Sequence, residues 1–471
     1  MRSGIGILLG ALVWLAASAP DAALRQVTLP REQQKEVAVT IYNGNLGLVR
    51  DVREVVLPVG VQEVKFMDVA AQIDPTSVHL KSLTETNGVR ILEQNYEYDL
   101  LSPQKLLDKY IGKTVRLMTG DGSLVEAVLL SNNSGPIYQI NGQIHLGHPG
   151  RVILPELPEN LIPKPTLVWL LQSGSARPQR VEASYLTGGI TWKADYVLVL
   201  NGADTRGDLS GWVTIDNKSG ATYAGAALKL VAGDIHRVKP RKEMREVLEM
   251  AAKSPRADAG RQFQEESFFE YHLYSLEGRT TIKQNQTKQI SLLGAEGVPI
   301  KKEFRYYGAS QYYRSQLGTP LSNQKVGVFL EIRNRQQDKL GLPLPKGTIR
   351  VYKASADQSL QLVGEDAIDH TPKDETVKIK MGEAFDVVGE RTQRDWKKIA
   401  SNLYETEWEI QIRNHKPEEI RVSILEPVPG DWEVLKESHP HEKIEAHTLK
   451  YVVAVPKNGK TTVTYRVRMR W

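Results

Sequence analysis

The sequence predicts an all-β protein made of several immunoglobulin-like β-sandwich modules, with a small SH3-like or Sm-like barrel inserted and one or two short helices. Two observations lead to this fold class. Many short segments alternate apolar and polar residues, which is the two-residue period of half-buried strands. In addition, a strand-like run that ends at an asparagine recurs four times, as VAVTIYN from Val37, GWVTIDN from Gly211, VFLEIRN from Val328 and WEIQIRN from Trp408.

The last copy of this asparagine phrase is typical of a hairpin. Trp408, Ile410 and Ile412 fall on one face of a strand; the pattern breaks at Asn414 and resumes at Ile420. An asparagine side chain can bond to nearby backbone at such a break. The copies are unequally spaced, which argues against a solenoid of fixed period and favours several sandwich modules that use the same hairpin.

The first residues, MRSGIGILLGALVWLAASAP, predict a secretory signal peptide. Arg2 precedes a short apolar run from Ile5 to Ala17, and small residues follow near Ala19. No cysteine follows this run, so we do not expect a lipoprotein. After Leu24 no apolar stretch approaches about 18 residues, so we expect no transmembrane segment in the mature chain. The predicted location is therefore periplasmic or secreted.

Composition limits the remaining classes. The 471 residues suggest two to four domains, and 41% hydrophobic with 25% charged residues is ordinary for globular chains. There is no cysteine, which rules out disulfides, thiol catalysis and thiolate metal sites. The net charge is +5 with both signs interspersed, which indicates no more than a modest preference for anionic surfaces.

Residues 102 to 154 differ from the sequence around them. Ser102 can cap a helix that has Pro103 at its first position, and about five short strands follow, with turns at Asp121-Gly122 and Asn141-Gly142. A short helix followed by five short strands predicts the small barrel. Sm-like barrels often bind RNA, but the predicted export and the lack of a basic, aromatic-rich patch argue against a nucleic-acid partner.

Further elements follow a proline-rich connector from Pro155 to Pro165. Helical spacing of Met244, Val247, Leu248 and Ala251 predicts one amphipathic helix, followed by a polar, mobile stretch. The rest reads as strands. In the last one, Val463, Tyr465, Val467, Met469 and Trp471 share one face, and we expect this strand to be docked in a sheet.

The predicted domains are a signal peptide (1–23), an N-terminal β domain (24–98), the barrel insert (99–160), a central β-sandwich (161–240), a helix and linker (241–266), a continued central β region (267–394) and a C-terminal immunoglobulin-like sandwich (395–471).

Candidate metal ligands are sparse. The close histidine groups are His145 with His148, and His439 with His441 and His447. The run GEDAIDHTPKDE gathers acidic residues around Asp366 and Asp369, but it lacks the spacing and glycine of a calcium loop. Solvated loops explain both patterns, so we predict no metal and no cofactor. No nucleophile elbow, phosphate loop, dinucleotide fingerprint or zinc-protease helix is present, so we assign no catalytic residue.

Aromatic residues gather in EFRYYGASQYYRSQL. Exposed tyrosine beside arginine is favoured at protein interfaces, and flat rings can also stack on sugars. The alternative is that these rings lie half-buried on strand faces. The candidate interaction surface consists of Arg305, Tyr306, Tyr307, Tyr312, Tyr313 and Arg314.

Several phrases resemble one known family. They are VEASYLTGGITWKADYVLVL, GWVTIDNKSGATYAGAALKLVAGD, FFEYHLYSLEGRTTIKQNQTKQISLL, LPLPKGTIRVY, VGEDAIDHTPKDETVKIKMGEAFDVVGER and YETEWEIQIRNHKPEEIRVSILEPVPGDWEV. From about Val181 to the end, the chain resembles the exported bacterial proteins grouped as domain of unknown function 4139. The resemblance implies a largely β, exported protein of Gram-negative type, with no established activity and no site residues to transfer.

The leading functional hypothesis is a non-catalytic envelope protein that binds or scaffolds another envelope protein or a polysaccharide. It rests on the predicted export, the sandwich modules and the Tyr/Arg-rich segment. Edge strands of such sandwiches could also accept a partner strand. Two alternatives stay open: an envelope hydrolase, perhaps metal-dependent, that acts on glycan or peptide, and a surface adhesin or appendage subunit.

Overall fold

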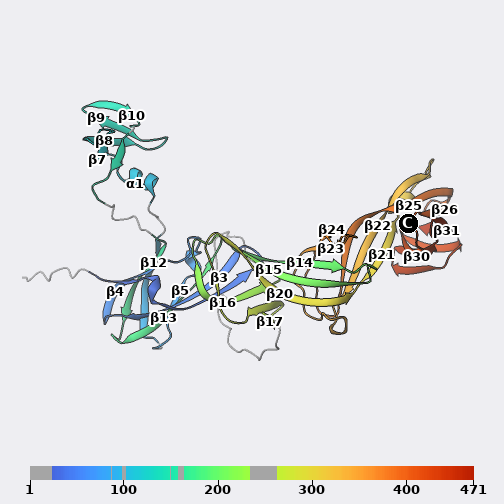
Figure 1. Ribbon diagram of the computed structural model, residues 1–471, viewed down its shortest axis with the longest axis horizontal. Coiled ribbons are helices and arrows are strands. Elements are labelled where there is room, and N and C mark those ends of the chain that lie inside the picture. Colours follow the sequence, from blue (N-terminus) through green and yellow to red (C-terminus); the bar gives the residue numbers. More distant parts are fainter. Residues whose placement is uncertain (1–23, 86, 98–101, 149, 157–163, 234–261) are drawn as a thin grey trace, which may run out of the picture. The chain divides into compact units, whose positions relative to one another are not determined.

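The computed structural model describes residues 24–85, 87–97, 102–148, 150–156, 164–233 and 262–471. The predicted all-β class is confirmed, because these residues form five multi-stranded sheets and a single α-helix (Figure 1). The predicted signal peptide and the predicted helix from Met244 to Ala251 lie outside the described residues. The domain boundaries derived from the sequence stay predictions.

The chain divides into two compact units, of which the first comprises Met1–Glu36 and Arg50–Tyr185. One of its sheets has the order β1-β4-β12-β6, with β1 parallel to β4. Elsewhere in this unit β13 pairs antiparallel with β5. The strands are β1 (Arg25–Leu29), β3 (Leu46–Val56), β4 (Gly60–Met67), β5 (His79–Ser82), β6 (Val89–Glu97), β12 (Thr166–Ser173) and β13 (Pro178–Thr187), and the 3-10 turns are η1 (Arg31–Gln33) and η2 (Pro75–Ser77).

The insert follows its sequence closely. Helix α1 (Pro103–Lys109) begins after Ser102, whose hydroxyl accepts the backbone N–H of Lys105 at 3.2 Å. Gly122 and Gly142 have φ of 85° and 79°, which explains glycine at both turns. The five strands form an antiparallel sheet of order β10-β9-β8-β7-β11; its closure into a barrel stays a prediction. They are β7 (Thr114–Met118), β8 (Leu124–Ser131), β9 (Ile137–Ile140), β10 (Gln143–Leu146) and β11 (Arg151–Ile153).

The second unit comprises Val37–Val49 and Leu186–Trp471. In one sheet, strands β17, β18, β16 and β2 lie next to one another in this order, and β2 runs parallel to β16. A second sheet has the order β20-β15-β14-β23-β24. The strands are β2 (Gln34–Tyr42), β14 (Ile190–Leu200), β15 (Arg206–Asn217), β16 (Tyr223–Ala232), β17 (Phe263–Phe268), β18 (Tyr271–Leu276), β19 (Thr280–Ile282), β20 (Gln286–Pro299), β23 (Gly347–Ala354) and β24 (Leu360–Ile368).

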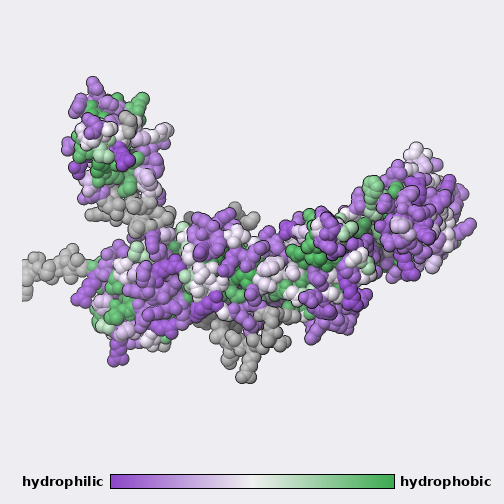
Figure 2. Space-filling model, in the orientation of Figure 1, coloured by the Kyte–Doolittle hydropathy of each residue, from purple (hydrophilic) through white to green (hydrophobic). Residues whose placement is uncertain are grey.

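Strand β24 lies at the edge of its sheet. Figure 2 shows hydrophobic residues gathered where Figure 1 labels β23 and β24, and Leu360, Leu362 and Val363 are exposed there. At the other end of the strand, Asp366 accepts the backbone N–H of Lys380 at 2.6 Å. The Asp366 end of this edge strand therefore contacts β25 of the neighbouring sheet, whereas its apolar end, at Leu360, Leu362 and Val363, is exposed.

Nine strands between residues 301 and 470 form the C-terminal sheet, of order β28-β31-β26-β25-β22-β21-β27-β30-β29. Its strands are β21 (Lys301–Tyr307), β22 (Leu321–Arg333), β25 (Thr376–Ala400), β26 (Leu403–Asn414), β27 (Ile420–Pro427), β28 (Asp431–Glu437), β29 (His441–Glu445), β30 (Thr448–Val455) and β31 (Gly459–Arg470), with 3-10 turns η3 (Ser310–Tyr313) and η4 (Gln336–Asp338).

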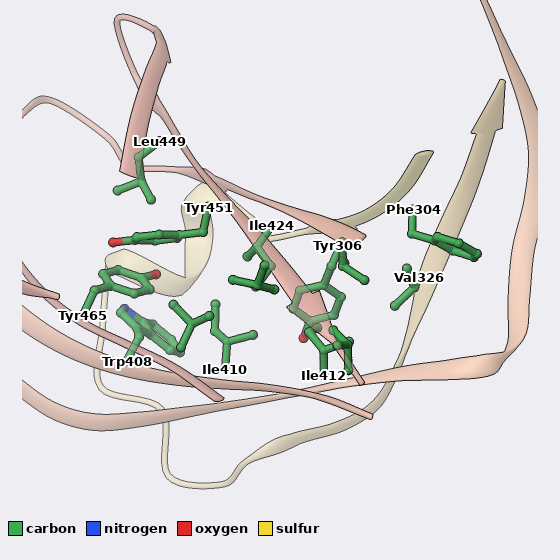
Figure 3. Packing of buried hydrophobic residues seen from close by; sticks show 14 of the residues in the cluster. Phe304, Tyr306, Val326, Trp408, Ile410, Ile412, Ile424, Leu449, Tyr451 and Tyr465 are labelled. Atoms are coloured by element: carbon green, nitrogen blue, oxygen red, sulfur yellow. The ribbon is translucent and has the colours of Figure 1, made fainter. Parts of the chain in front are cut away.

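The last strand buries its predicted face with one exception. Val463, Tyr465, Val467 and Met469 are buried in the core of this sheet, part of which Figure 3 shows. Trp471, on the same face, is 43% exposed. It follows the end of β31, and its ring stacks on Tyr404, with centroids 4.6 Å apart.

The asparagine phrases do not form the predicted hairpins at three of their four positions. Strand β26 pairs with β25 and β31, whereas β27 pairs with β21 and β30, so the strands on either side of Asn414 are not partners. Strands β15 and β16, joined after Asn217, also pair elsewhere, as do β22 and β23, joined after Asn334. The hairpin interpretation was therefore wrong for these phrases.

The reason is that each asparagine closes a connection between strands that do not pair. The Asn414 amide is buried and donates to the carbonyls of Glu418, Val455 and Pro456, while its oxygen accepts the Lys416 N–H at 3.0 Å. The Asn217 and Asn334 amides each also donate to three carbonyls. One side chain thus satisfies several backbone carbonyls where the chain leaves one strand and crosses to another.

Candidate binding groove

The structure divides the Tyr/Arg-rich segment between core and surface. Tyr306 and Tyr313 are buried in the core of the C-terminal sheet, and Tyr312 packs partly buried against it. Tyr307 is 50% exposed, and Arg314 is exposed. The alternation of β21 explains part of the split, because Phe304 and Tyr306 point inward while Arg305 and Tyr307 point outward.

The buried tyrosines belong to a polar network around one ion pair. Arg391 and Glu426 are fully buried and form a bidentate contact with N to O distances of 2.6 and 2.7 Å. The hydroxyls of Tyr313 and Tyr465 contact the same carboxylate at 2.6 and 3.0 Å. Without these partners either charge would be costly to bury.

Aromatic rings enclose the guanidinium of this pair. The Arg391 Cζ atom lies 5.2 Å from the ring centroids of both Tyr306 and Tyr312. A Cβ atom at Gly308 would lie 2.7 Å from the Arg391 and Glu426 side chains, so the chain needs glycine there. Burial raises the pKa of Tyr306 to about 12, so its hydroxyl stays protonated and donates to Gln324. The network is internal and fixes residues 308–313 on the core.

Sequence reasoning missed this ion pair because its partners lie on different strands. One signal was present: the two-residue period puts Glu426 on the same face as Ile420, Val422 and Ile424. A carboxylate on an apolar strand face predicts a buried partner, but it does not identify Arg391.

The outward side chains of the same segment line a groove of about 410 Å³ on the C-terminal sheet. Strands β21, β22, β25, β27, β29 and β30 contribute to it. We call this site the binding groove, and its lining residues are Lys301, Glu303, Arg305, Tyr307, Gly308, Glu331, Lys378, Leu425, Pro427, Ile444, Glu445, Thr448 and Lys450.

Ion pairs fix one wall of the binding groove. The Arg305 guanidinium donates to Glu303 at 2.6 and 2.9 Å and to Glu331 at 2.7 Å, and Lys301 contacts Glu331 at 3.2 Å. The Ser423 hydroxyl donates to Glu303 at 2.7 Å. Burial alone would raise the pKa of Glu303, but the hydroxyl and the guanidinium outweigh it, so the pKa lies below its ordinary value.

Phe329 on β22 holds the aromatic part of the same wall. Its ring centroid lies 4.8 Å from the Arg305 guanidinium and 6.2 Å from the Tyr307 ring, which meets it edge to face. A Cβ atom at Gly327 would lie 2.9 Å from the Phe329 ring, so glycine leaves room for it. Arg305 and Tyr307 are therefore positioned before any ligand arrives, which lowers the ordering cost of binding.

The lining of the binding groove has one more cationic than carboxylate side chain. Four cationic and three carboxylate side chains line it, and the Glu303 and Glu331 carboxylates are already engaged by Arg305 and Lys301. Lys378 pairs with no carboxylate among the described residues, and Lys450 has only a 3.9 Å contact to Glu442. Beside them stand the exposed side chains of Tyr307 and Ile444. This combination suits an extended partner with acidic and apolar groups.

The other candidate residues do not line this groove. His441 Nδ1 contacts Glu437 at 2.8 Å, and His447 Nδ1 contacts the Gly430 carbonyl oxygen at 3.1 Å. His439 contacts Ser438, and His148 accepts the Gly150 N–H, while His145 lies on β10. Asp366 is engaged by backbone N–H groups, and Asp369 lies just after β24. Within the described ranges, no three such side chains have metal-binding geometry.

Comparisons with known proteins place the chain in a family. The helices of the described part of the chain are too short or too polar to span a bilayer. No curated protein matches the sequence. The model of one family, described as Domain of unknown function (DUF4139), matches residues 181–471, which include the binding groove and the buried ion pair. The chain therefore belongs to the DUF4139 family.

Proposed function

We propose that this chain is an exported cell-envelope protein that binds or scaffolds another envelope protein or polymer through the binding groove, without catalysis. The observation that carries the proposal is the groove itself. Contacts within the chain hold Arg305 and Tyr307 in place there, whereas Lys378 forms no ion pair with a carboxylate among the described residues. The signal-peptide pattern of the first residues supports export.

The groove has the features of a recognition surface. Its wall is preorganised by ion pairs and aromatic contacts, which limits the entropy lost on binding. Its rim offers a half-exposed tyrosine and basic side chains, and tyrosine and arginine are enriched at interfaces. A groove of about 410 Å³ can receive one or two side chains or sugar units of an extended partner.

Crosslinked capture from isolated envelopes tests the proposal. The variant combines Tyr307→Ser with Lys378→Glu, two exposed positions whose replacement leaves the core intact. We expect the wild type to retain a discrete envelope component that this variant loses. Replacing Tyr306 or Tyr313 would be uninformative, because both are buried and their loss would disturb folding.

The matched control is Leu146→Ser, which removes an exposed apolar side chain from β10 and should leave capture unchanged. Equal capture by the wild type and the groove variant would overturn the proposal. Turnover of an envelope substrate that is lost in the groove variant would instead favour the hydrolase alternative.

A further inference from the structure

A hairpin elsewhere in the second unit exposes two phenylalanines. Strands β17 and β18 pair antiparallel up to Phe268 and Tyr271, so Phe269 and Glu270 form a two-residue loop. Phe268 is 41% exposed, and Phe269 is 82% exposed. We call Phe268, Phe269 and Glu270 the aromatic finger. Among the described residues, the Phe269 ring contacts Tyr271, with ring centroids 6.1 Å apart, but most of its surface stays open to solvent.

The backbone of the aromatic finger is also unfavourable for phenylalanine. Phe269 has a φ of 57°, and Glu270 is not among the residues with positive φ. The first loop position of a two-residue hairpin with positive φ normally takes glycine, because a Cβ atom crowds the backbone there. A bulky residue in this region is a genuine outlier. Neither the backbone conformation nor burial among the described residues favours phenylalanine at this position.

Acidic residues surround the two rings. Glu265 and Glu266 precede the finger, and Glu270 lies within it. Glu265 contacts His272 at 2.7 Å. Glu266 and Glu270 form no ion pair with any residue in the described ranges. The surface presented by the finger is therefore aromatic and negative.

The binding groove has the complementary chemistry. Its rim carries Lys378 and Lys450, and Tyr307 and Ile444 supply apolar surface beside them. Pockets of about 300–1,000 Å³ hold small ligands, so a groove of about 410 Å³ has room for an aromatic side chain. The Phe side chains would fill the apolar part while the flanking carboxylates face the lysines.

We propose that the aromatic finger of one copy docks in the binding groove of a second copy of this chain. The inference rests on the proposed function of the groove as a binding site and names one occupant for it. Each copy has one finger and one groove, so the contact is head-to-tail and leaves a free finger and a free groove at the ends. Such a contact yields a concentration-dependent ladder of oligomers.

Sedimentation velocity of the purified chain without the predicted signal peptide tests this inference. We expect the wild type to form dimers and larger species as concentration rises, and to lose them at high salt because the charges are screened. The finger variant, Phe268→Ser with Phe269→Gly, should be monomeric. The groove variant, Lys378→Glu with Lys450→Glu, should also be monomeric.

Mixing the two variants gives the sharpest test. The finger variant keeps an intact groove, and the groove variant keeps an intact finger, so the mixture should form a dimer and nothing larger. Restoring charge complementarity by adding Glu266→Lys and Glu270→Lys to the groove variant should restore the ladder. The control Leu146→Ser should associate like the wild type.

Two results would overturn the docking: a wild type that stays monomeric up to its solubility limit, or a finger variant that associates like the wild type. Folding of each variant is checked by circular dichroism, and all the replaced side chains lie at or near the surface. Failure of docking is separable from failure of the proposed function. If the wild type is monomeric but still captures an envelope component through the groove, the proposed function stands and the docking fails. If it self-associates but captures nothing, the docking stands and the proposed function fails.

Discussion

At the scale of single residues, charges that lie away from water organise this protein. Arg391 and Glu426 are fully buried, and each is satisfied only because the other is present. The hydroxyls of Tyr313 and Tyr465 complete the carboxylate's contacts. In the binding groove, Arg305 has a similar role between two carboxylates, but there the network reaches the surface. Arginine–carboxylate ion pairs therefore stabilise the core at Arg391 and position the groove wall at Arg305.

Arg391→Met should destabilise the fold by about 3–5 kcal/mol, because it leaves the Glu426 carboxylate buried without its cation. The double variant Arg391→Met with Glu426→Leu should cost clearly less than the sum of the two single changes. Urea unfolding followed by circular dichroism measures all three. Additive losses would contradict a coupled pair.

Acid should weaken the fold through Glu303. Its folded pKa lies below the ordinary value of 4.5, so the carboxylate contributes stability that is fully present above pH 4.5 and is lost as pH falls through the folded pKa. Glu303→Gln should therefore lower the melting temperature near neutral pH and reduce its fall below pH 4.5. Thermal melts of both proteins across this range measure the effect, and parallel curves would refute it.

At the scale of elements, the sequence predicted local features such as caps, turns and strand alternation, but it did not predict which strands pair with each other. The cap at Ser102, the glycine turns of the insert and the alternation of β31 were all predicted and are present. The asparagine phrases were correctly identified as strand ends. Their hairpin interpretation failed because Asn414 bonds to carbonyls about 40 residues away, and alternation does not encode such a partner.

Asn414→Ala should destabilise the protein by about 1–3 kcal/mol, because it leaves three buried or partly buried carbonyls without their donor. The matched comparison is Asn458→Ala, an asparagine in the turn before β31 that has positive φ and no comparable set of bonds among the described residues. Denaturant unfolding measures both variants. A smaller loss for Asn414→Ala than for Asn458→Ala would contradict the structural role of the buried amide.

Phe269→Gly should stabilise the isolated chain, although it removes a large apolar side chain. Glycine relieves the strain of positive φ, and Phe269 buries little of its surface. We expect a net gain of only about 0.5–1 kcal/mol, because the higher entropy of the unfolded chain with glycine offsets part of the relieved strain. Thermal melting of dilute protein measures this gain. A loss of more than about 1 kcal/mol would show that the ring is part of the folded core.

At the scale of the whole molecule, the sequence predicted the all-β class and the family, but not the site. The Tyr/Arg-rich segment was recognised, yet composition could not separate Tyr307 on the surface from Tyr306 in the core. Strand alternation separates them only when the strand's register is known. The binding groove also needs Lys378 and Lys450, which lie 71 and 143 residues after Tyr307 in the chain. Only the pairing of β25, β22, β21, β27 and β30 brings these regions together.

The most direct measurement places a photoreactive amino acid at Tyr307 in the intact cell and irradiates it. Tyr307 lines the groove and is half exposed, so a bound partner would lie within crosslinking reach. We expect a discrete adduct, with a second copy of the chain or with another envelope component, and no adduct from the same amino acid at Leu146. An intact, folded chain that gives no adduct at Tyr307 would contradict the binding role of the groove.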